Sequence, residues 1–257
     1  MTQSSPKAMR TPPTPQQQAE RVDWNDLLPE FLDAFEEGQH IAIIGPTGEG
    51  KTTFSVSILD EFHRLGASEL FLANKNRDPL LTKLVQSGWS RITSWPPDYA
   101  QRQGRRVILW PSYGRASRAK SNRPIFEYAL DMALLEGHWV VYFDEMRYFI
   151  EQMGMRSLVD EYWNGARSSG LTVIAASQGT TWINKTMIRQ ESWLVLFRPR
   201  SLEEMKEYAD AIGDRDAVED LRALKRHEFL LVHTPNGRRF ISKLPVRRET
   251  ARPEVRR

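Results

Sequence analysis

The sequence predicts an α/β fold, in which a largely parallel, doubly wound sheet is covered by helices on both faces. Short apolar runs alternate with segments of helical periodicity along most of the chain. These runs are continuous rather than apolar at every second residue, as expected for strands that are buried on both faces. A glycine-rich loop follows the first run directly and precedes a helix, which is the order of a parallel βα unit.

The predicted strands cover about residues 40–44, 69–74, 106–110, 139–143, 171–176 and 192–197. The predicted helices cover about residues 51–65, 78–86, 124–136, 156–168, 201–211 and 216–225. A further amphipathic helix is predicted over residues 23–35, where apolar residues recur at three- and four-residue spacing. Residues 227–244 predict a C-terminal β-hairpin, because an Asn236-Gly237 turn separates two apolar strands.

The chain is predicted to form one folded domain, since 257 residues can bury a single sizeable core. We assign residues 21–245 to this domain. Residues 1–20 are rich in Pro, Gln, Ser and Thr and have almost nothing to bury, so they predict a disordered tail. Residues 246–257 form a basic C-terminal tail with five arginines and two glutamates.

Composition excludes several classes of protein. No apolar run approaches the roughly 20 residues that cross a bilayer, so no membrane segment is expected. The N-terminus lacks the apolar core of a secretory signal. The chain has no cysteine, which excludes a disulfide framework, and its histidines lack metal-ligand spacing. These features predict a cytoplasmic protein.

The segment GPTGEGKT, residues 45–52, matches the phosphate-binding motif G-x-x-x-x-G-K-[ST] at every fixed position. Glycines let backbone N–H groups converge on phosphate oxygens, and the following helix directs its positive end at the same anion. The motif predicts ATP as the ligand, with the Lys51 ammonium on the β- and γ-phosphates and the Thr52 hydroxyl on Mg²⁺. The candidate nucleotide-binding residues are Gly45, Pro46, Thr47, Gly48, Glu49, Gly50, Lys51, Thr52 and Thr53.

Two adjacent carboxylates, Asp144 and Glu145, end the apolar run WVVYF at residues 139–143. In enzymes with this phosphate loop, an Asp at such a strand end holds Mg²⁺. Side chains alternate along an extended backbone, so the second carboxylate points elsewhere and can polarise the attacking water. We therefore predict Thr52 and Asp144 as metal ligands and Glu145 as the catalytic base, acting with Lys51. A base supplied by the protein favours an ATPase over a kinase.

Basic residues gather between residues 101 and 123, where seven Lys or Arg residues occur without an acid. This pattern is as typical of a solvated surface loop as of a polyanion-binding surface. The candidate nucleic-acid contacts are Arg115, Arg118 and Lys120. Their loop holds one aromatic residue, Tyr113, and so is suited to gripping phosphates rather than stacking bases.

Two further polar residues flank the predicted strand at residues 171–176. Gln178 follows it and is equally consistent with a sensor near the γ-phosphate and with a cap of the next helix. Arg167 precedes it and on chemistry alone is best interpreted as an exposed cation at a helix end.

The motif order GPTGEGKT, VVYFDE, A-R-x-x-G-L-x-V-I-x-A-x-Q and LVLFRPRSLEEMKEYADAIG resembles the FtsK–HerA superfamily of DNA-pumping ATPases. The resemblance covers about residues 38–233 and implies a RecA-like P-loop core with an additional central strand (the ASCE type). It implies a homo-oligomeric ring, either a pentamer or a hexamer, with Arg167 as a finger reaching the neighbour's nucleotide and Gln178 as the sensor. The chain departs from the family at Gly179-Thr180, where Arg-Pro is usual.

The expected function is an ATP-hydrolysing motor that translocates double-stranded DNA. A motor core of this size resembles the viral genome-packaging ATPases of the superfamily, which implies a portal or capsid protein as a partner. The site of action would then be the host cytoplasm or the virion. One alternative is a conjugation or virion-export motor acting on single-stranded DNA. Another is an ATP-dependent switch that translocates nothing.

Overall fold

The computed structural model describes residues 18–75, 78–98, 105–111, 119–182 and 193–245. Within these ranges the strands are β1 (Glu20–Arg21), β2 (Ile41–Ile44), β3 (Ser68–Leu72), β4 (Ser90–Ile92), β5 (Arg106–Leu109), β6 (Trp139–Phe143), β7 (Thr172–Ser177), β8 (Trp193–Phe197), β9 (Glu228–His233) and β10 (Arg238–Lys243). The α-helices are α1 (Trp24–Ala34), α2 (Lys51–Arg64), α3 (Pro79–Gln86), α5 (Ala119–Glu136), α6 (Arg156–Gly165), α8 (Leu202–Ile212) and α9 (Ala217–Arg222). Shorter helical segments are the π-helix η2 (Tyr148–Gln152) and the 3₁₀-helices η3 (Ala166–Ser169) and η4 (Thr180–Trp182).

The ten described strands form one sheet in the order β1-β10-β9-β8-β2-β7-β6-β3-β5-β4. All neighbouring pairs in this order are parallel except the two that involve β9. The order confirms the predicted additional central strand, because β7 separates β2 from β6. The hairpin of β9 and β10 also forms as predicted, with Asn236 and Gly237 at its turn.

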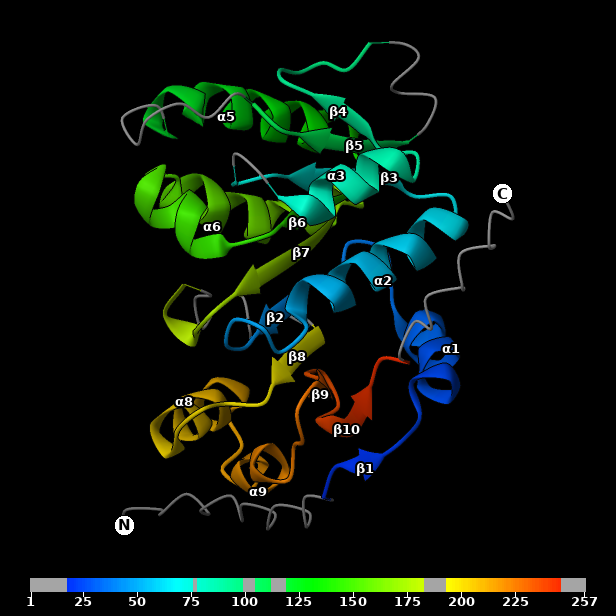
Figure 1. Cartoon of the computed structure of the whole chain (residues 1–257), viewed down its shortest axis with the longest axis vertical. Helices are drawn as coiled ribbons and strands as arrows, with labels where there is room; N and C mark the ends of the chain where they lie inside the picture. Colours follow the sequence, from blue (N-terminus) through cyan, green and yellow to red (C-terminus); the bar gives the residue numbers. More distant parts are fainter. Residues whose placement is uncertain (1–17, 76–77, 99–104, 112–118, 183–192, 246–257) are drawn as a thin grey trace, which may run out of the picture.

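Helices cover both faces of the sheet, and each face has its own apolar core (Figure 1). One core contains the buried faces of α5, α6 and α8, and the other contains those of α1, α2 and α3. In α1, the buried Trp24, Leu27 and Phe31 lie at three- and four-residue spacing, which places them on one side of the helix. Asp23 caps this helix by accepting a hydrogen bond from the Asn25 N–H at 2.9 Å.

The structure differs from the sequence prediction at short elements and at element boundaries. Strands β1 and β4 were not predicted, because two and three residues are too short to show a periodicity. β1 crosses the predicted boundary at residue 20, since Glu20 pairs with Phe240 in the sheet. Helix α6 ends at Gly165, and the predicted helix to residue 168 continues as the 3₁₀-helix η3.

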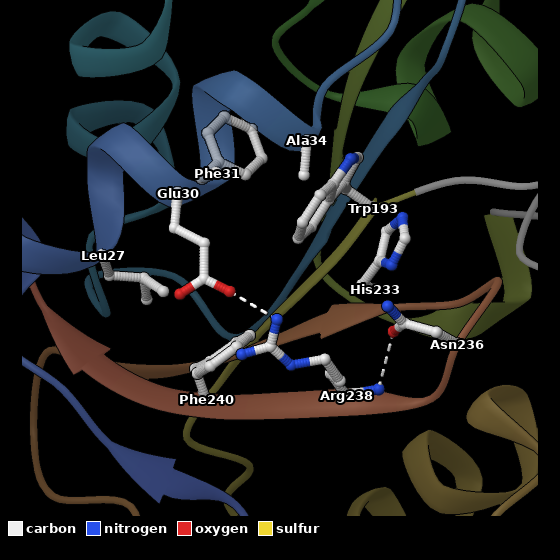
Figure 2. Close-up of a pocket in the computed structure, with 9 residues that line it drawn as sticks. All are labelled: Leu27, Glu30, Phe31, Ala34, Trp193, His233, Asn236, Arg238 and Phe240. Atoms are coloured by element: carbon white, nitrogen blue, oxygen red, sulfur yellow. Dashed lines mark hydrogen bonds and ion pairs between the residues drawn. The ribbon is translucent and has the colours of Figure 1, made fainter.

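Helix α1 also packs against the hairpin (Figure 2). Glu30 of α1 accepts a hydrogen bond from Arg238 of β10 at 2.5 Å, and the Arg238 guanidinium lies 4.7 Å from the centre of the Phe240 ring. Phe31 of α1 contacts Trp193 of β8 with ring centres 4.8 Å apart, and the Trp193 ring lies 4.3 Å from that of His233 in β9. These contacts join the amphipathic helix to the C-terminal end of the domain.

On the opposite face of β10, Arg239 forms a buried ionic cluster. It pairs with Asp214 and, through Nε at 2.7 Å, with Asp220, and all three side chains are less than a tenth exposed. Asp220 also accepts a hydrogen bond from the Ala19 N–H at 3.0 Å. The cluster therefore ties β10 to α9 and to the segment before β1.

No helix in the described part of the chain is both long enough and apolar enough to cross a membrane.

Replacing Arg239 by alanine leaves two buried carboxylates without their cation, so Arg239→Ala should lower the free energy of unfolding by about 3–5 kcal/mol. Arg238→Ala is the matched control, because its ion pair with Glu30 is half exposed and worth about 0–1 kcal/mol. Urea denaturation of both variants measures the difference. Similar small losses for the two variants would contradict a structural role for the cluster.

Candidate active site

The candidate site lies at the carboxyl edge of the parallel strands. The phosphate loop joins β2 to α2, Asp144 and Glu145 follow β6, and Gln178 follows β7. Because β7 pairs in parallel with both β2 and β6, these three strand ends meet at one edge of the sheet. The Gly45 N–H bonds to the Ser177 carbonyl at 3.1 Å, which joins the start of the loop directly to the end of β7.

Each glycine of the loop has its own reason to be glycine. A Cβ on Gly45 would lie 2.5 Å from the Phe197 Cβ of β8, so close packing of the strands excludes a side chain there. Gly48 and Gly50 have φ angles of 89° and 119°, a backbone region that L-residues rarely adopt. A Cβ on Gly48 would meet no atom within 4 Å, so its requirement is conformational. The loop therefore has the bend that turns N–H groups toward an anion.

Lys51 begins α2 and is buried against its own loop. Its ammonium donates to the Gly45 carbonyl at 2.6 Å and to the Pro46 carbonyl at 3.0 Å. Burial lowers the Lys51 pKa, while Glu145 and Asp144 act in the opposite direction. The ammonium is thus held over the loop, at the position where it would reach terminal phosphates.

Asp144 is buried and both of its oxygens are engaged. Oδ1 accepts from the Tyr142 hydroxyl at 3.1 Å and from the Thr52 hydroxyl at 3.5 Å. Oδ2 accepts from the Lys75 ammonium at 3.1 Å. The two predicted metal ligands therefore converge, and Asp144 already faces one cation. Hydroxyl and carboxylate oxygens beside a phosphate loop fit Mg²⁺, so Thr52 and Asp144 would hold the ion, and the ion would supply positive charge next to the phosphates.

Glu145 contacts Gln178. The Gln178 side-chain amide donates to Glu145 Oε2 at 2.9 Å. Glu145 Oε1 is buried and has no hydrogen-bond partner among the described residues. One carboxylate oxygen is fixed by Gln178 and the other is left to accept a proton, which is the arrangement that a general base requires. Gln178 therefore contacts Glu145, and both roles left open for it, sensor and helix cap, stay predictions.

Arg167 lies at the opposite edge of the sheet. It belongs to η3, which precedes β7, whereas Gln178 follows β7. A strand of six residues spans roughly 20 Å, so Arg167 lies too far from the phosphate loop of the same chain to reach a nucleotide held there. Its side chain is exposed, and a Cβ on Gly38 would come within 2.9 Å of its carbonyl oxygen.

The candidate DNA contacts Arg115 and Arg118 lie outside the described residues, as does the side chain of Lys120 at the start of α5.

Sequence reasoning missed two cations at this site, Lys75 and Arg200. Lys75 follows β3, and Arg200 follows β8 and donates to the Thr47 carbonyl of the phosphate loop at 3.2 Å. Both act on Lys51 by lowering its pKa, after the larger effect of burial. A signal was present, since each residue comes shortly after the carboxyl end of a parallel strand, the edge where such sites form.

A pocket of about 380 Å³ opens beside the phosphate loop. Its lining combines apolar and polar side chains from the loop, α2, α3 and the ends of β8 to β10: Glu49, Gly50, Thr53, Val56, Ser57, Leu80, Phe197, His227, Lys243, Leu244 and Pro245. His227 contacts the loop through Nδ1, 3.1 Å from the Glu49 carbonyl. The pocket is large enough for a nucleoside and adjoins the segment that would bind its phosphates.

Together the fold and the loop define a P-loop NTPase structure of the type with an additional central strand. No protein-family model and no curated protein matches the chain. The DNA-packaging ATPase B204 from Sulfolobus turreted icosahedral virus matches with a TM-score of 0.62 at 18% identity, over 82% of this chain and 100% of that one.

Two further solved structures have the same fold. The genome-packaging NTPase B204 from Sulfolobus turreted icosahedral virus 2, in complex with ATP-γ-S, gives a TM-score of 0.58 at 14% identity, over 80% of this chain and 96% of that one. VirB4 of Thermoanaerobacter pseudethanolicus gives 0.61 at 9% identity, over 80% and 89%. At 9–18% identity these likenesses show the fold, a P-loop NTPase core with a largely parallel sheet.

The site geometry predicts that binding and hydrolysis can be separated by mutation. Lys51→Ala should abolish nucleotide binding, because the ammonium over the loop is lost. Glu145→Gln should bind ATP like the wild type yet hydrolyse it at least about a hundredfold more slowly, the usual scale of a lost general base. Equilibrium binding and single-turnover hydrolysis measure the two steps. Wild-type turnover in Glu145→Gln would rule out Glu145 as the base.

Proposed function

We propose that this chain is an FtsK–HerA ATPase that couples ATP hydrolysis to the movement of double-stranded DNA, as in viral genome packaging. The observation that carries this proposal is the contact between Gln178 and Glu145 beside the phosphate loop. It joins a candidate sensor to a candidate base at the carboxyl edge of a fold that DNA-packaging ATPases share. VirB4 has the same fold, so the choice of duplex over single-stranded DNA is part of the proposal.

In this proposal the residues of one subunit bind ATP and activate water. Backbone N–H groups of the loop and the Lys51 ammonium hold the phosphates, and the nucleoside occupies the pocket lined by Thr53. Mg²⁺, when bound by Thr52 and Asp144, neutralises charge that develops on the phosphates. Glu145 Oε1 takes a proton from the attacking water, while Gln178 holds Oε2 and so fixes the orientation of the carboxylate.

A neighbouring subunit supplies Arg167 in this proposal. The residue lies at the amino edge of β7, so it can serve only a nucleotide bound elsewhere. A head-to-tail ring would place that edge against the loop of the next subunit, and repeating the contact closes a pentamer or hexamer. An arginine in this position stabilises the charge of the transition state without being needed for ATP binding.

If Arg167 acts across a subunit junction, Arg167→Ala should bind ATP normally and lose roughly 10³-fold or more in turnover. Mixing Arg167→Ala subunits with inactive Lys51→Ala subunits should restore part of the activity, because some junctions then pair an intact loop with an intact arginine. Steady-state ATPase assays at varied mixing ratios measure the rescue. Full turnover by isolated wild-type monomers, together with an unimpaired Arg167→Ala variant, would refute a shared site.

The DNA contact is assigned to Arg115, Arg118 and Lys120, and a portal or capsid protein would be the partner that receives the DNA. The triple alanine variant should keep its basal ATPase activity and lose stimulation by duplex DNA. Its binding should also lose up to about three units of salt-dependence slope, one for each phosphate contact. A chain ending at Val246 tests the competing contribution of the C-terminal arginines.

The same titration separates the alternatives. Stimulation by single-stranded DNA alone would favour a conjugation or export motor. Weakened binding only in the truncated chain would assign the DNA contact to the tail. Turnover that no DNA stimulates would leave the ATP-dependent switch as the better account.

A further inference from the structure

The strand beside β6 brings a lysine to the candidate magnesium carboxylate. β3 pairs in parallel with β6, with Leu72 opposite Phe143, so the residues after both strands share one edge. The Lys75 ammonium lies 3.1 Å from Asp144 Oδ2 and 3.3 Å from Asp78 Oδ2. The Lys75 side chain is 52% exposed and that of Asp144 only 6%, so a partly exposed cation faces a buried anion.

Lys75 provides the only cationic contact to Asp144 among the described ion pairs. The hydroxyls of Tyr142 and Thr52 occupy Oδ1, but they bring no charge. A buried carboxylate without a counter-ion is costly, and the ammonium removes that cost in the absence of a metal ion. A divalent cation bound by Asp144 and Thr52 would meet the ammonium as a like charge at short range.

We propose that Lys75 is the internal counter-ion of the metal site: it neutralises Asp144 in the empty enzyme and competes with Mg²⁺ for that carboxylate. The inference rests on the proposed function, since it requires a nucleotide-linked metal at Asp144. Binding of Mg²⁺ with ATP must then displace the ammonium, and part of the binding free energy is spent on this displacement.

The surroundings of Lys75 give the displaced ammonium a second acceptor. Asp78 caps α3 by accepting from the Leu80 N–H through Oδ1 at 2.8 Å, while its Oδ2 faces Lys75. The Lys75 carbonyl accepts from the Trp110 indole N–H at 2.7 Å, which fixes the backbone. The side chain can therefore turn from Asp144 to Asp78 while its backbone stays in place.

The test is the strength of the linkage between metal and nucleotide. The Kd of a fluorescent, non-hydrolysable ATP analogue is measured in EDTA and in saturating Mg²⁺. The quantity compared between variants is the Kd in EDTA divided by the Kd in Mg²⁺. The affinity of the free analogue for Mg²⁺ is the same in every experiment, so it does not affect the comparison of the ratio between variants. Lys75→Met should enlarge the ratio by roughly fivefold, the scale of one partly exposed ion pair. Lys75→Arg keeps the charge and should match the wild type.

Lys83→Met is the matched control, because Lys83 is an exposed lysine on α3 and its loss changes the net charge equally. Thermal melting of each variant verifies folding. An unchanged or smaller ratio in Lys75→Met would overturn the competition. Wild-type protein that binds no analogue under either condition would overturn the proposed function along with this inference.

Discussion

The parallel pairing of β2, β7 and β6 determines where the candidate catalytic groups lie. Ile44 pairs with Ser177, and Phe143 pairs with Ala175, so the three strands end at nearly the same level. The residues that follow these strands share one edge of the sheet, although Gly45 and Gln178 are 133 positions apart in the sequence. A slip of one residue in either pairing would turn these side chains to the wrong face of the sheet.

The same constraint separates the two ends of β7. Gln178 follows the strand and contacts the candidate base Glu145, whereas Arg167 precedes the strand and lies at its other end. Strand β7 therefore lies between Gln178, a residue of the candidate site, and Arg167, the residue proposed to serve a neighbouring subunit's site. The departure from the usual Arg-Pro at Gly179-Thr180 falls just beyond Gln178, where Thr180 instead donates to Glu207 of α8 at 3.3 Å.

Sequence patterns predicted the parts of this fold that repeat or that carry fixed chemistry. Long apolar runs identified the buried strands, and the spacing of Gly45, Gly50 and Lys51 identified the loop, because both reflect local requirements of the backbone. The short strands β1 and β4 could not be predicted, since their residues become strands only through pairing with β10 and β5. Their stability comes from tertiary contacts that no local pattern encodes.

The site was predictable to a similar extent. A motif specifies Lys51 and Thr52, and a strand end specifies Asp144 and Glu145, so the sequence predicted these positions directly. Lys75 belongs to no motif, and its contact with Asp144 depends on β3 being the neighbour of β6. Strand order is a long-range property, and one sequence does not reveal it before the fold is known.

We propose that Gln178 and Glu145 act as one catalytic unit. A double-mutant cycle in single-turnover ATP hydrolysis tests it directly, using Glu145→Gln, Gln178→Ala and the double variant. If Gln178 works by orienting the Glu145 carboxylate, its loss should matter little once Glu145 is gone, and the double variant should hydrolyse ATP at about the rate of Glu145→Gln. Independent losses that multiply in the double variant would show that the two residues act separately.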